Sequence, residues 1–394
     1  MQETTTISRQ EQLDETCRQC RVEGRFAFDT EFVMEDRFEA EVCLIQVATE
    51  ASVTVIDPFL DLDLRSLWAL VCDKEVETVV HAGQEDLGLC VQHTGQIPQQ
   101  VYDVQIAAGL TGYDYPLSLQ KLVQTALHIH LHKSKTLTDW RKRPLAADQI
   151  RYAAEDVSHL LAVRRKLHER LSKRNRLDWA REEFARFEEM SLYRRAEEDK
   201  LLRVKGSGAL KGRSLAIVHE LLTWREELAK QRNRPVRVAL RDHLLVEIAK
   251  FELCSFKAVR ALRGLNLSDR DIRGLCRVVE KAVNLPSEQW PVLTPRTIET
   301  PKEAALIALV GAVLRSYCLE HDIAYGLMAS KRSIHKLVRY CTKGRPARRG
   351  DVELLTGWRG RTVGAMLEGI LAGQRSIQVE SFDGERFVRV TPVE

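Results

Sequence analysis

Two carboxylates stand close together at the end of an apolar segment. Asp29 and Glu31 follow Phe26-Ala27-Phe28, and a β-strand over residues 26–32 would place both side chains on one face. Such a pair is costly on an apolar strand unless a cation neutralises it. Hard divalent ions such as Mg²⁺ prefer carboxylate oxygens. The pair therefore indicates half of a metal site, although a polar strand end at a sheet edge would give the same pattern.

Two further acidic residues lie in suitable settings. Asp86 follows His81-Ala82-Gly83, where an expected strand gives way to a helix. Asp156 lies four residues after Tyr152 within an expected helix, so both side chains project from one helix face. Four carboxylates and a phenol at one sheet edge could hold two divalent ions, which activate water and stabilise the leaving oxygen in phosphodiester cleavage. Taken singly, Asp86 could be a helix cap and Asp156 a solvated helix residue.

The elements that must position these residues alternate between strand and helix in the front half of the chain. Three closely spaced runs predict a meander of antiparallel strands at 26–32, 42–48 and 53–57. Shorter strands are expected at 78–81 and 101–103, and helices at 64–72, 84–92, 104–109, 119–127 and 147–170. This order predicts an α/β domain with a mixed sheet.

Strand patterns disappear after about residue 179. We expect a charged helical connector over 181–202, a helical block over 210–283, a proline-containing linker over 285–301 and a second helical block over 302–373. Alternating apolar residues over 377–390, around Asp383-Gly384, predict a β-hairpin. The two helical blocks are similar in size and layout, which is compatible with a divergent duplication.

The net charge of +4 is unevenly distributed. Residues 1–170 carry 18 Lys and Arg against 27 Asp and Glu, a net charge of −9, whereas residues 171–394 carry 42 against 29, a net charge of +13. An acidic front half is compatible with a carboxylate-lined metal site, and a basic rear half is typical of nucleic-acid binding. Many basic faces are merely solvated, but together the halves indicate a phosphate-cutting domain joined to phosphate-binding domains.

Composition argues against several classes of protein. Apolar residues make up 44% and charged residues 29% of the 394 residues, as in ordinary globular proteins. The longest apolar run, at 304–314, is too short to span a bilayer, so no membrane association is expected. The N-terminus lacks a signal-peptide layout and the nine cysteines are scattered, which favours a cytoplasmic protein. Cys17 and Cys20 form a lone CxxC, which we expect on an N-terminal helix.

These motifs, in this order, resemble the DEDD superfamily of 3′–5′ exonucleases in its tyrosine-bearing branch, and more closely the bacterial ribonuclease D family. The resemblance covers residues 24–170 and implies a ribonuclease H-like mixed sheet flanked by helices. It is carried by Phe28 to Phe32, Leu44 to Gln46, Ile56 to Pro58, His81 to Gly83, Glu85 to Leu87, Leu119 to Leu122, Lys133-Ser134, Thr138 to Trp140, Arg143 to Leu145 and Tyr152 to Ala154.

The rear half is similar to HRDC domains, which are small all-α bundles shared with RecQ-type helicases. The similarity is carried by Leu221 to Glu226, Arg234-Pro235 and Leu240 to Asp242 in the first block and, less tightly, by Ala329 to Arg332 and Leu355 to Arg359 in the second. Leu253-Cys254-Ser255 departs from the pattern, which usually has a proline before its small polar residue. The resemblance implies an exonuclease domain with its connector over 1–200, a first HRDC domain over 208–290 and a second, with the hairpin, over 300–394.

The resemblance also implies roles for the acidic residues and the tyrosine. Asp29, Glu31, Asp86 and Asp156 would bind two Mg²⁺ or Mn²⁺ ions, and Asp29 would be the residue that touches both. Tyr152 would orient or help deprotonate the attacking water, and its ordinary pKa near 10 disfavours full general-base action unless the metal ions lower it. The reaction would release nucleoside 5′-monophosphates one at a time from the 3′ end.

Residues that contact the substrate are expected near these motifs and in the second helical block. Phe32 and Val33 could wedge against the terminal bases or sugar, although Phe32 could equally belong to the core. The residues placed to reach the terminal nucleotide or a phosphate are His81, Gln84, Lys133, Lys331 and Arg332. A basic loop over 343–349 is a further candidate phosphate contact, with simple solubility as its alternative explanation.

Three functions remain open from the residues alone. The first is a 3′–5′ exoribonuclease that trims structured RNA such as tRNA precursors, with no protein partner implied. The second is the same chemistry on DNA, since the carboxylates do not distinguish the sugars. The third is an inactive RNA-binding scaffold, which the presence of all four carboxylates and Tyr152 argues against. A helicase is excluded because the sequence has no GxxxxGK[ST] phosphate loop.

Overall fold

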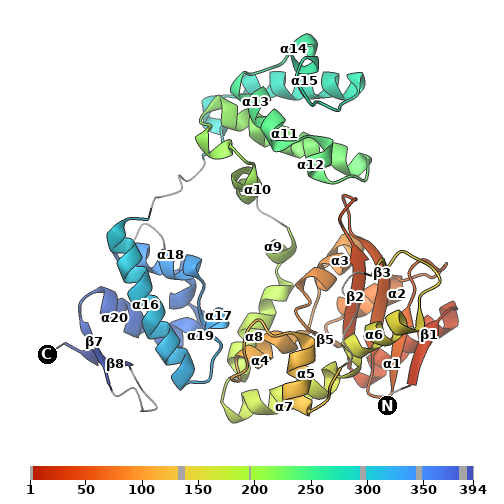
Figure 1. The fold of residues 1–394 in the computed structure, drawn as a ribbon, viewed down its shortest axis with the longest axis vertical. Coiled ribbons are helices and arrows are strands. Elements are labelled where there is room, and N and C mark those ends of the chain that lie inside the picture. Colours follow the sequence, from red (N-terminus) through yellow and green to blue (C-terminus); the bar gives the residue numbers. More distant parts are fainter. Residues whose placement is uncertain are drawn as a thin grey trace. The chain divides into compact units, whose positions relative to one another are not determined.

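The computed structural model describes residues 3–131, 138–194, 197–292, 299–342, 348–380 and 388–393 (Figure 1). The chain divides into two compact units. The first unit comprises Met1–Glu31, Leu44–Glu189 and Ile298–Glu394, and the second comprises Phe32–Cys43 and Met190–Thr297. Apart from residues 32–43, the front half of the chain and the C-terminal block therefore belong to the first unit.

A six-stranded mixed sheet forms the centre of the first unit (Figure 1). Its strands are β1 (Glu3–Ile7), β2 (Arg25–Val33), β3 (Glu41–Ala48), β4 (Ser52–Ile56), β5 (Glu77–Val80) and β6 (Val101–Asp103), in the order β1-β4-β3-β2-β5-β6. The pairs β2–β5 and β5–β6 are parallel, whereas β3 and β4 are antiparallel. The carboxyl ends of β2, β5 and β6 consequently meet at one edge, and the predicted mixed sheet is confirmed.

The helices of the front half surround this sheet. They are α1 (Gln10–Glu23), α2 (Arg65–Val71), α3 (Gln84–Thr94), α4 (Val104–Gly109), α5 (Leu119–Leu127), α6 (Ala147–Ser158), α7 (Leu160–Lys173) and α8 (Leu177–Phe184). The sheet interior is apolar, with Phe26 and Phe28 on β2 and Leu44 and Ile45 on β3 all fully buried. Almost every residue of β3 after the first is buried, as expected of a central strand that reads as a continuous apolar run.

Two sequence-based expectations for the front half need correction. β1 was not expected, because its sequence Glu-Thr-Thr-Thr-Ile is mostly polar; it is an edge strand that pairs in parallel with β4, a setting in which β-branched threonine is favourable. The single helix expected over 147–170 is two helices, α6 and α7, which break at His159. No glycine or proline marks that break, and the apolar pattern continues through it. The expected N-terminal helix is confirmed as α1, where Cys17 and Cys20 are buried.

The second unit contains a helical bundle with its own apolar core. After the short α9 (Met190–Tyr193), its helices are α10 (Glu197–Arg203), α11 (Arg213–Gln231), α12 (Val236–Ala239), α13 (Asp242–Lys250), α14 (Phe256–Arg260) and α15 (Asp269–Val283). Leu221, Leu245 and Leu275 lie at the centre of the core. An ion pair joins the buried Arg225 on α11 to the half-buried Asp242 on α13, with an N–O distance of 2.7 Å. The predicted helical block over 210–283 is confirmed.

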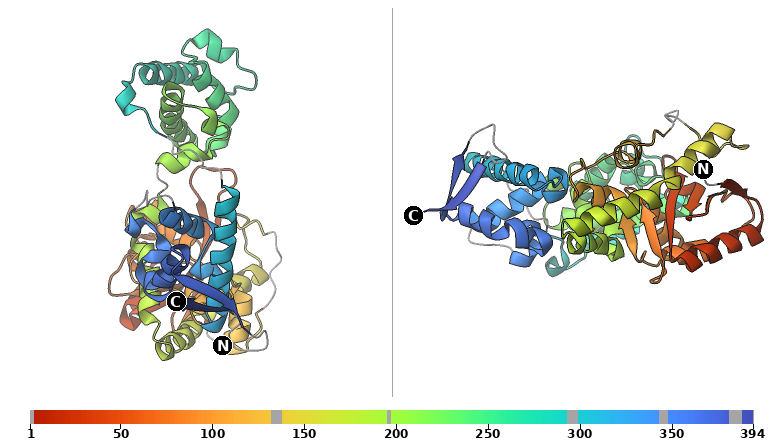
Figure 2. Two further views of the ribbon diagram at one scale, coloured as in Figure 1. Left: turned by 90° about the vertical axis from the view of Figure 1, so that its left-hand side faces the viewer. Right: turned by 90° about the horizontal axis from the view of Figure 1, so that it is seen from below.

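The C-terminal block of the first unit is also helical. Its helices are α16 (Pro301–Glu320), α17 (Tyr325–Met328), α18 (Lys331–Thr342), α19 (Gly357–Arg359) and α20 (Ala365–Leu371), with short 3₁₀ or π turns at Arg349–Asp351, Glu353–Leu355 and Gly360–Gly364. Earlier in the chain, short 3₁₀ turns lie at Ala185–Glu188, Ser207–Ala209 and Ser287–Gln289. Thr300 caps α16 by accepting from the Glu303 amide, and Pro301 occupies the first turn. The expected hairpin is the antiparallel pair β7 (Arg375–Val379) and β8 (Val388–Pro392) beside α20 (Figure 2).

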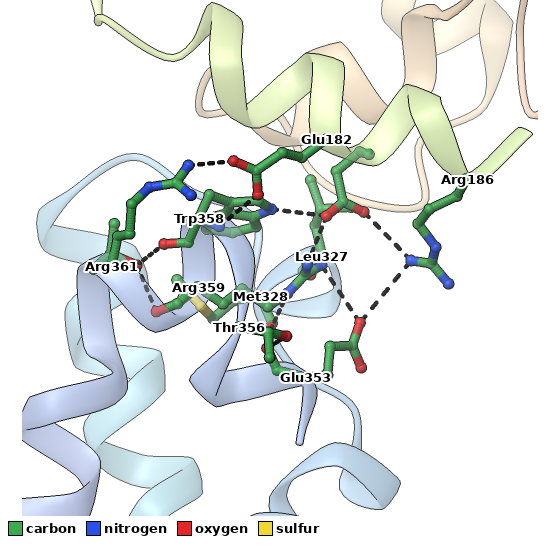
Figure 3. Close-up of polar contacts among 11 residues, drawn as sticks. Glu182, Arg186, Leu327, Met328, Glu353, Thr356, Trp358, Arg359 and Arg361 are labelled. Atoms are coloured by element: carbon green, nitrogen blue, oxygen red, sulfur yellow. Dashed lines mark hydrogen bonds and ion pairs between the residues drawn. The ribbon is translucent and has the colours of Figure 1, made fainter. Parts of the chain in front are cut away.

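A buried polar network joins α8 of the exonuclease-like part to α19 of the C-terminal block (Figure 3). The Glu183 carboxylate, only 3% exposed, accepts hydrogen bonds from the Trp358 indole at 2.7 Å and the Arg359 guanidinium at 2.6 Å. The Trp179 and Trp358 rings stack with centroids 4.9 Å apart. Arg359 also donates to the backbone carbonyls of residues 327 and 328. These contacts explain why residues 298–394 group with the sheet. No helix in the described ranges is long and apolar enough to cross a membrane.

Candidate active site

The predicted pair Asp29 and Glu31 lies at the carboxyl end of β2, where the parallel strands meet. Both side chains are half-buried, whereas Thr30 between them is buried. This alternation is the one predicted for a strand with one accessible face. The two carboxylates therefore share the sheet edge at which α3 begins.

Asp86 comes to this edge from the first turn of α3 and is 8% exposed. The Thr30 amide donates to Asp86 Oδ1 at 3.1 Å, and the Thr30 hydroxyl donates to the same oxygen. The N-cap residue of α3 is Gly83, so no side chain caps this helix. Asp86 is therefore held against β2, and the alternative that it caps its own helix is wrong.

Tyr152 and Asp156 lie one turn apart on α6, and the Tyr152 phenol is among the groups that act on the pKa of the Asp156 carboxylate. Burial, followed by the neighbouring Asp156, Glu31 and Asp29, raises the pKa of the Tyr152 phenol. Asp156 is thus not an isolated surface residue, because its electrostatic environment includes Tyr152 and the carboxylates from β2 and α3.

The four carboxylates behave electrostatically as one cluster. Burial, then repulsion by Asp86, Asp156 and Glu31, raises the pKa of Asp29 well above its ordinary value. Burial, then repulsion by Asp156 and Asp86, raises the pKa of Glu31 to about 8, and burial is the main cause that raises the pKa of Asp156 to about 7. Burial likewise raises the pKa of Asp86. The interactions that set these four pKa values in the described chain include no lysine or arginine.

This donor set fits divalent cations. Several acidic oxygens that disfavour one another's ionisation and lack a basic partner are stabilised by a hard cation, which prefers such ligands. Within the described residues, no group of three or more Asp, Glu, His or Cys side chains is placed so that it could hold a metal ion as it stands. Asp86 instead accepts hydrogen bonds from Thr30. The chemistry of the residues is therefore that of a metal site in which one carboxylate is held by neighbouring hydrogen-bond donors.

The turn that leads into α3 is held by Asp103, a buried carboxylate at the end of β6. It accepts hydrogen bonds from the backbone amides of Ala82 and Gly83, each at 3.2 Å, and it caps α4 through Gln105 at 2.8 Å. Ala82 adopts a left-handed conformation with φ of 56°. Sequence reasoning missed Asp103 as a positioning residue, although an acidic residue between a buried strand and a helix is the setting that singled out Asp86.

The predicted substrate-contacting residues have varied surroundings. His81 follows β5, and its Nε2 lies 2.9 Å from the carbonyl of Leu117, while burial lowers the pKa of its imidazole. Gln84 is exposed at the first residue of α3, close to Asp86. The ring of Phe32 and the side chain of Val33 are half-buried at the end of β2. The structure thus brings His81 and Gln84 to the same strand-to-helix connection as Asp86.

The remaining candidates lie elsewhere. Lys331 and Arg332 are exposed at the start of α18, and Lys331 pairs with Glu299 at 3.3 Å. Lys133 lies outside the described residues, as do residues 343–347 of the predicted basic loop.

Comparison with known protein families matches two parts of the chain. A family described as 3′–5′ exonuclease matches residues 4–172, and the HRDC domain family matches residues 214–266. The first match contains all four carboxylates and Tyr152. The second lies within the helical bundle of the second unit.

Individual relatives match nearly the whole chain. The ribonuclease D of Gluconacetobacter diazotrophicus is 31% identical over 98% of this chain and 96% of its own length. The ribonuclease D of Pseudomonas paraeruginosa is 33% identical over 90% of this chain and 94% of its own. Among solved structures, Escherichia coli RNase D, described as an exoribonuclease involved in structured RNA processing, superposes with a TM-score of 0.80 at 28% identity, covering 95% and 99% of the two chains.

Proposed function

The chain belongs to the ribonuclease D family and is a 3′–5′ exoribonuclease, and we propose that Asp29, Glu31, Asp86 and Asp156 hold the divalent ions of its reaction. The observation that supports this assignment is that burial raises the pKa of all four carboxylates and that repulsion by other members of the set adds to this for Asp29, Glu31 and Asp156, with no basic partner among the causes. We further propose two ions, Mg²⁺ or Mn²⁺.

Each residue of the cluster has a distinct part in the reaction. When bound, two divalent ions supply an activated water and neutralise charge on the leaving oxygen of the terminal phosphodiester. Asp86 is kept in place by Thr30, which leaves its second oxygen for coordination. Tyr152 keeps its proton on the phenol oxygen at neutral pH because its pKa is raised, so it acts as a hydrogen-bonding group that orients the attacking water.

The substrate that fits best is RNA with a structured body and an accessible 3′ end, such as a tRNA precursor. This proposal draws on the described activity of the Escherichia coli relative and on the HRDC match at residues 214–266. It also draws on the net charge of +13 over residues 171–394, which suits contact with phosphates. The second HRDC domain proposed over 300–394 would contribute Lys331 and Arg332, while His81, Gln84, Phe32, Val33 and Lys133 would lie near the 3′ nucleotide.

Digestion of 5′-labelled RNA tests the metal-site assignment. With Mg²⁺, the wild-type protein should shorten the RNA stepwise from its 3′ end and release 5′-monophosphates. Asp29→Asn should lower kcat about a thousandfold, because a metal contributes several kcal/mol to the transition state and about 1.4 kcal/mol corresponds to tenfold. Asp61→Asn, at an exposed carboxylate, is the matched control and should retain wild-type kcat.

Two outcomes of this assay would contradict the proposal. Wild-type activity in Asp29→Asn would rule out the metal ligands named above. Faster digestion of a DNA oligomer of the same sequence would contradict RNA as the substrate, while leaving the metal assignment intact.

A further inference from the structure

Trp140 packs directly against the proposed catalytic tyrosine. Its side chain is 9% exposed, and its ring centroid lies 6.3 Å from that of Tyr152 with the ring planes inclined by 30°. Trp140 precedes α6 rather than belonging to it, so the contact joins a loop residue to a helix residue. The indole therefore covers one side of the phenol and restricts the positions that Tyr152 can take.

Arg143 fixes the backbone that carries Trp140. Its Nη1 donates to the Trp140 carbonyl at 2.8 Å and to the Lys142 carbonyl at 3.0 Å. The guanidinium also lies over the Phe59 ring, 4.6 Å from the ring centroid. One side chain thus closes the turn in which Trp140 lies.

Asp57 anchors Arg143 to the central sheet. Arg143 Nε lies 2.5 Å from Asp57 Oδ2 and Nη2 lies 2.7 Å from Oδ1, a two-pronged pair that fixes direction as well as distance. Asp57 is 9% exposed, directly follows β4, and accepts from the Phe59 amide at 2.9 Å. Because α6, which carries Tyr152, packs beside β4, which leads into Asp57, these contacts connect two neighbouring elements of the fold.

We propose that Asp57, Arg143 and Trp140 are positioning residues that hold the Tyr152 phenol in its catalytic orientation. This inference rests on the proposed role of Tyr152. None of the three residues is among the groups that set the pKa values of the four carboxylates, so they act through Tyr152 and not through metal binding. Their loss should lower kcat and leave KM for RNA unchanged.

A double-mutant cycle separates positioning from a general contribution to stability. Trp140→Leu should lower kcat about ten- to a hundredfold, since displacement of a catalytic group by about 1 Å costs up to a hundredfold. Trp140→Phe, which keeps an aromatic ring against Tyr152, should recover most of this loss. In the Tyr152→Phe background, Trp140→Leu should change kcat by less than about twofold, because the group that it positions is already gone. Thermal unfolding of each variant, followed by circular dichroism, identifies any loss due to misfolding.

The possible results separate the positioning role of Trp140 from the role of Tyr152. If the losses of Trp140→Leu and Tyr152→Phe multiply in the double variant, the positioning role is overturned and the role of Tyr152 stands. A rise in KM at unchanged kcat in Trp140→Leu would also overturn positioning. If Tyr152→Phe alone retains wild-type kcat, the proposed role of Tyr152 fails and this inference fails with it.

Arg143→Lys tests the anchor with a matched control. Lysine keeps the charge but cannot form the two-pronged pair with Asp57, so kcat should fall in Arg143→Lys at unchanged KM. Arg65 forms a similar pair with Asp63, with N–O distances of 2.9 and 2.5 Å, but on the exposed surface. Arg65→Lys should therefore behave as the wild type. Equal kcat in Arg143→Lys and Arg65→Lys would overturn the anchoring role of Arg143.

Discussion

At the scale of single residues, the short run Asp29-Thr30-Glu31 combines two different functions. The outer carboxylates belong to the electrostatic cluster, while the central threonine holds Asp86 through its amide and hydroxyl. Local alternation predicts that the outer two share a face. It cannot predict the partner of Thr30, because that partner is 56 residues further along the chain.

The raised pKa values predict a specific pH dependence of stability. Glu31 has a pKa near 8 in the folded protein and an ordinary value of 4.5, so it favours folding when protonated at low pH and this contribution is lost as the pH rises toward 8. In EDTA, the free energy of unfolding of Glu31→Gln should therefore increase relative to that of the wild type as the pH rises from 5 to 8.5. The increase should be about 1 kcal/mol or more, since one pKa unit corresponds to about 1.4 kcal/mol.

Urea unfolding at pH 5 and pH 8.5 measures this difference. Added Mg²⁺ should stabilise the wild type at pH 8.5 more than at pH 5, because a cation that binds only the folded, ionised cluster shifts the unfolding equilibrium. A constant difference between Glu31→Gln and wild type across this pH range would contradict the cluster.

At the scale of elements, the connection from β5 to α3 determines where Asp86 lies. Ala82 is held in a left-handed conformation, and a Cβ on Gly83 would meet Val80 at 2.5 Å, so the turn has little freedom. Asp103 stabilises it from the neighbouring strand by accepting from Ala82 and Gly83 while capping α4. One carboxylate thus fixes two helix starts.

Asp103→Asn should weaken this connection. The amide nitrogen of asparagine cannot accept the hydrogen bonds that one carboxylate oxygen accepts, and an unsatisfied buried group costs about 1–3 kcal/mol. The free energy of unfolding should fall by that amount, and kcat should fall with it because α3 carries Asp86. Asp114→Asn, at an exposed carboxylate, is the control for the same chemical change. Unchanged stability in Asp103→Asn would show that the turn is held by other contacts.

At the scale of the whole molecule, the described structure groups residues 298–394 with the central sheet. The sequence resemblance implied a second HRDC domain, with the C-terminal hairpin, over 300–394. In the structure, Glu183 on α8 binds Trp358 and Arg359 on α19, and these side chains are all buried (Figure 3). The C-terminal block therefore packs as part of the same compact unit as the catalytic residues.

Two arginines of this network provide a matched pair of variants. Arg359→Leu removes the buried ionic partner of Glu183, which then keeps only the more exposed Arg186 at 3.4 Å, and should lower the free energy of unfolding by about 3–5 kcal/mol. Arg361→Leu removes a pair with Glu182 in which the arginine is 56% exposed and should cost less than about 1 kcal/mol. Urea unfolding of the two variants measures the difference between their free energies of unfolding. Similar decreases in both variants would contradict a stabilising role of the buried ion pair at Glu183.

The sequence alone determined the parts of this protein that depend on local pattern. Strand alternation, helix spacing and the order of acidic motifs predicted the mixed sheet, the helical rear half and the residues proposed as metal ligands. Each of these patterns spans only a few residues, so it can be recognised in the sequence without knowledge of the fold. The β1 strand and the break at His159 escaped prediction because threonine-rich edges and continuous apolar patterns are locally ambiguous.

The tertiary structure decided everything that depends on which distant segments meet. It set the raised pKa values of the carboxylates, the contact of Thr30 with Asp86, the packing of Trp140 on Tyr152 and the attachment of α19 to α8. Burial, repulsion and hydrogen bonding act through space between residues that can be more than a hundred positions apart. Such distances are fixed only when the whole sheet and its helices pack, which is why the composition of the site was readable from the sequence and its geometry was not.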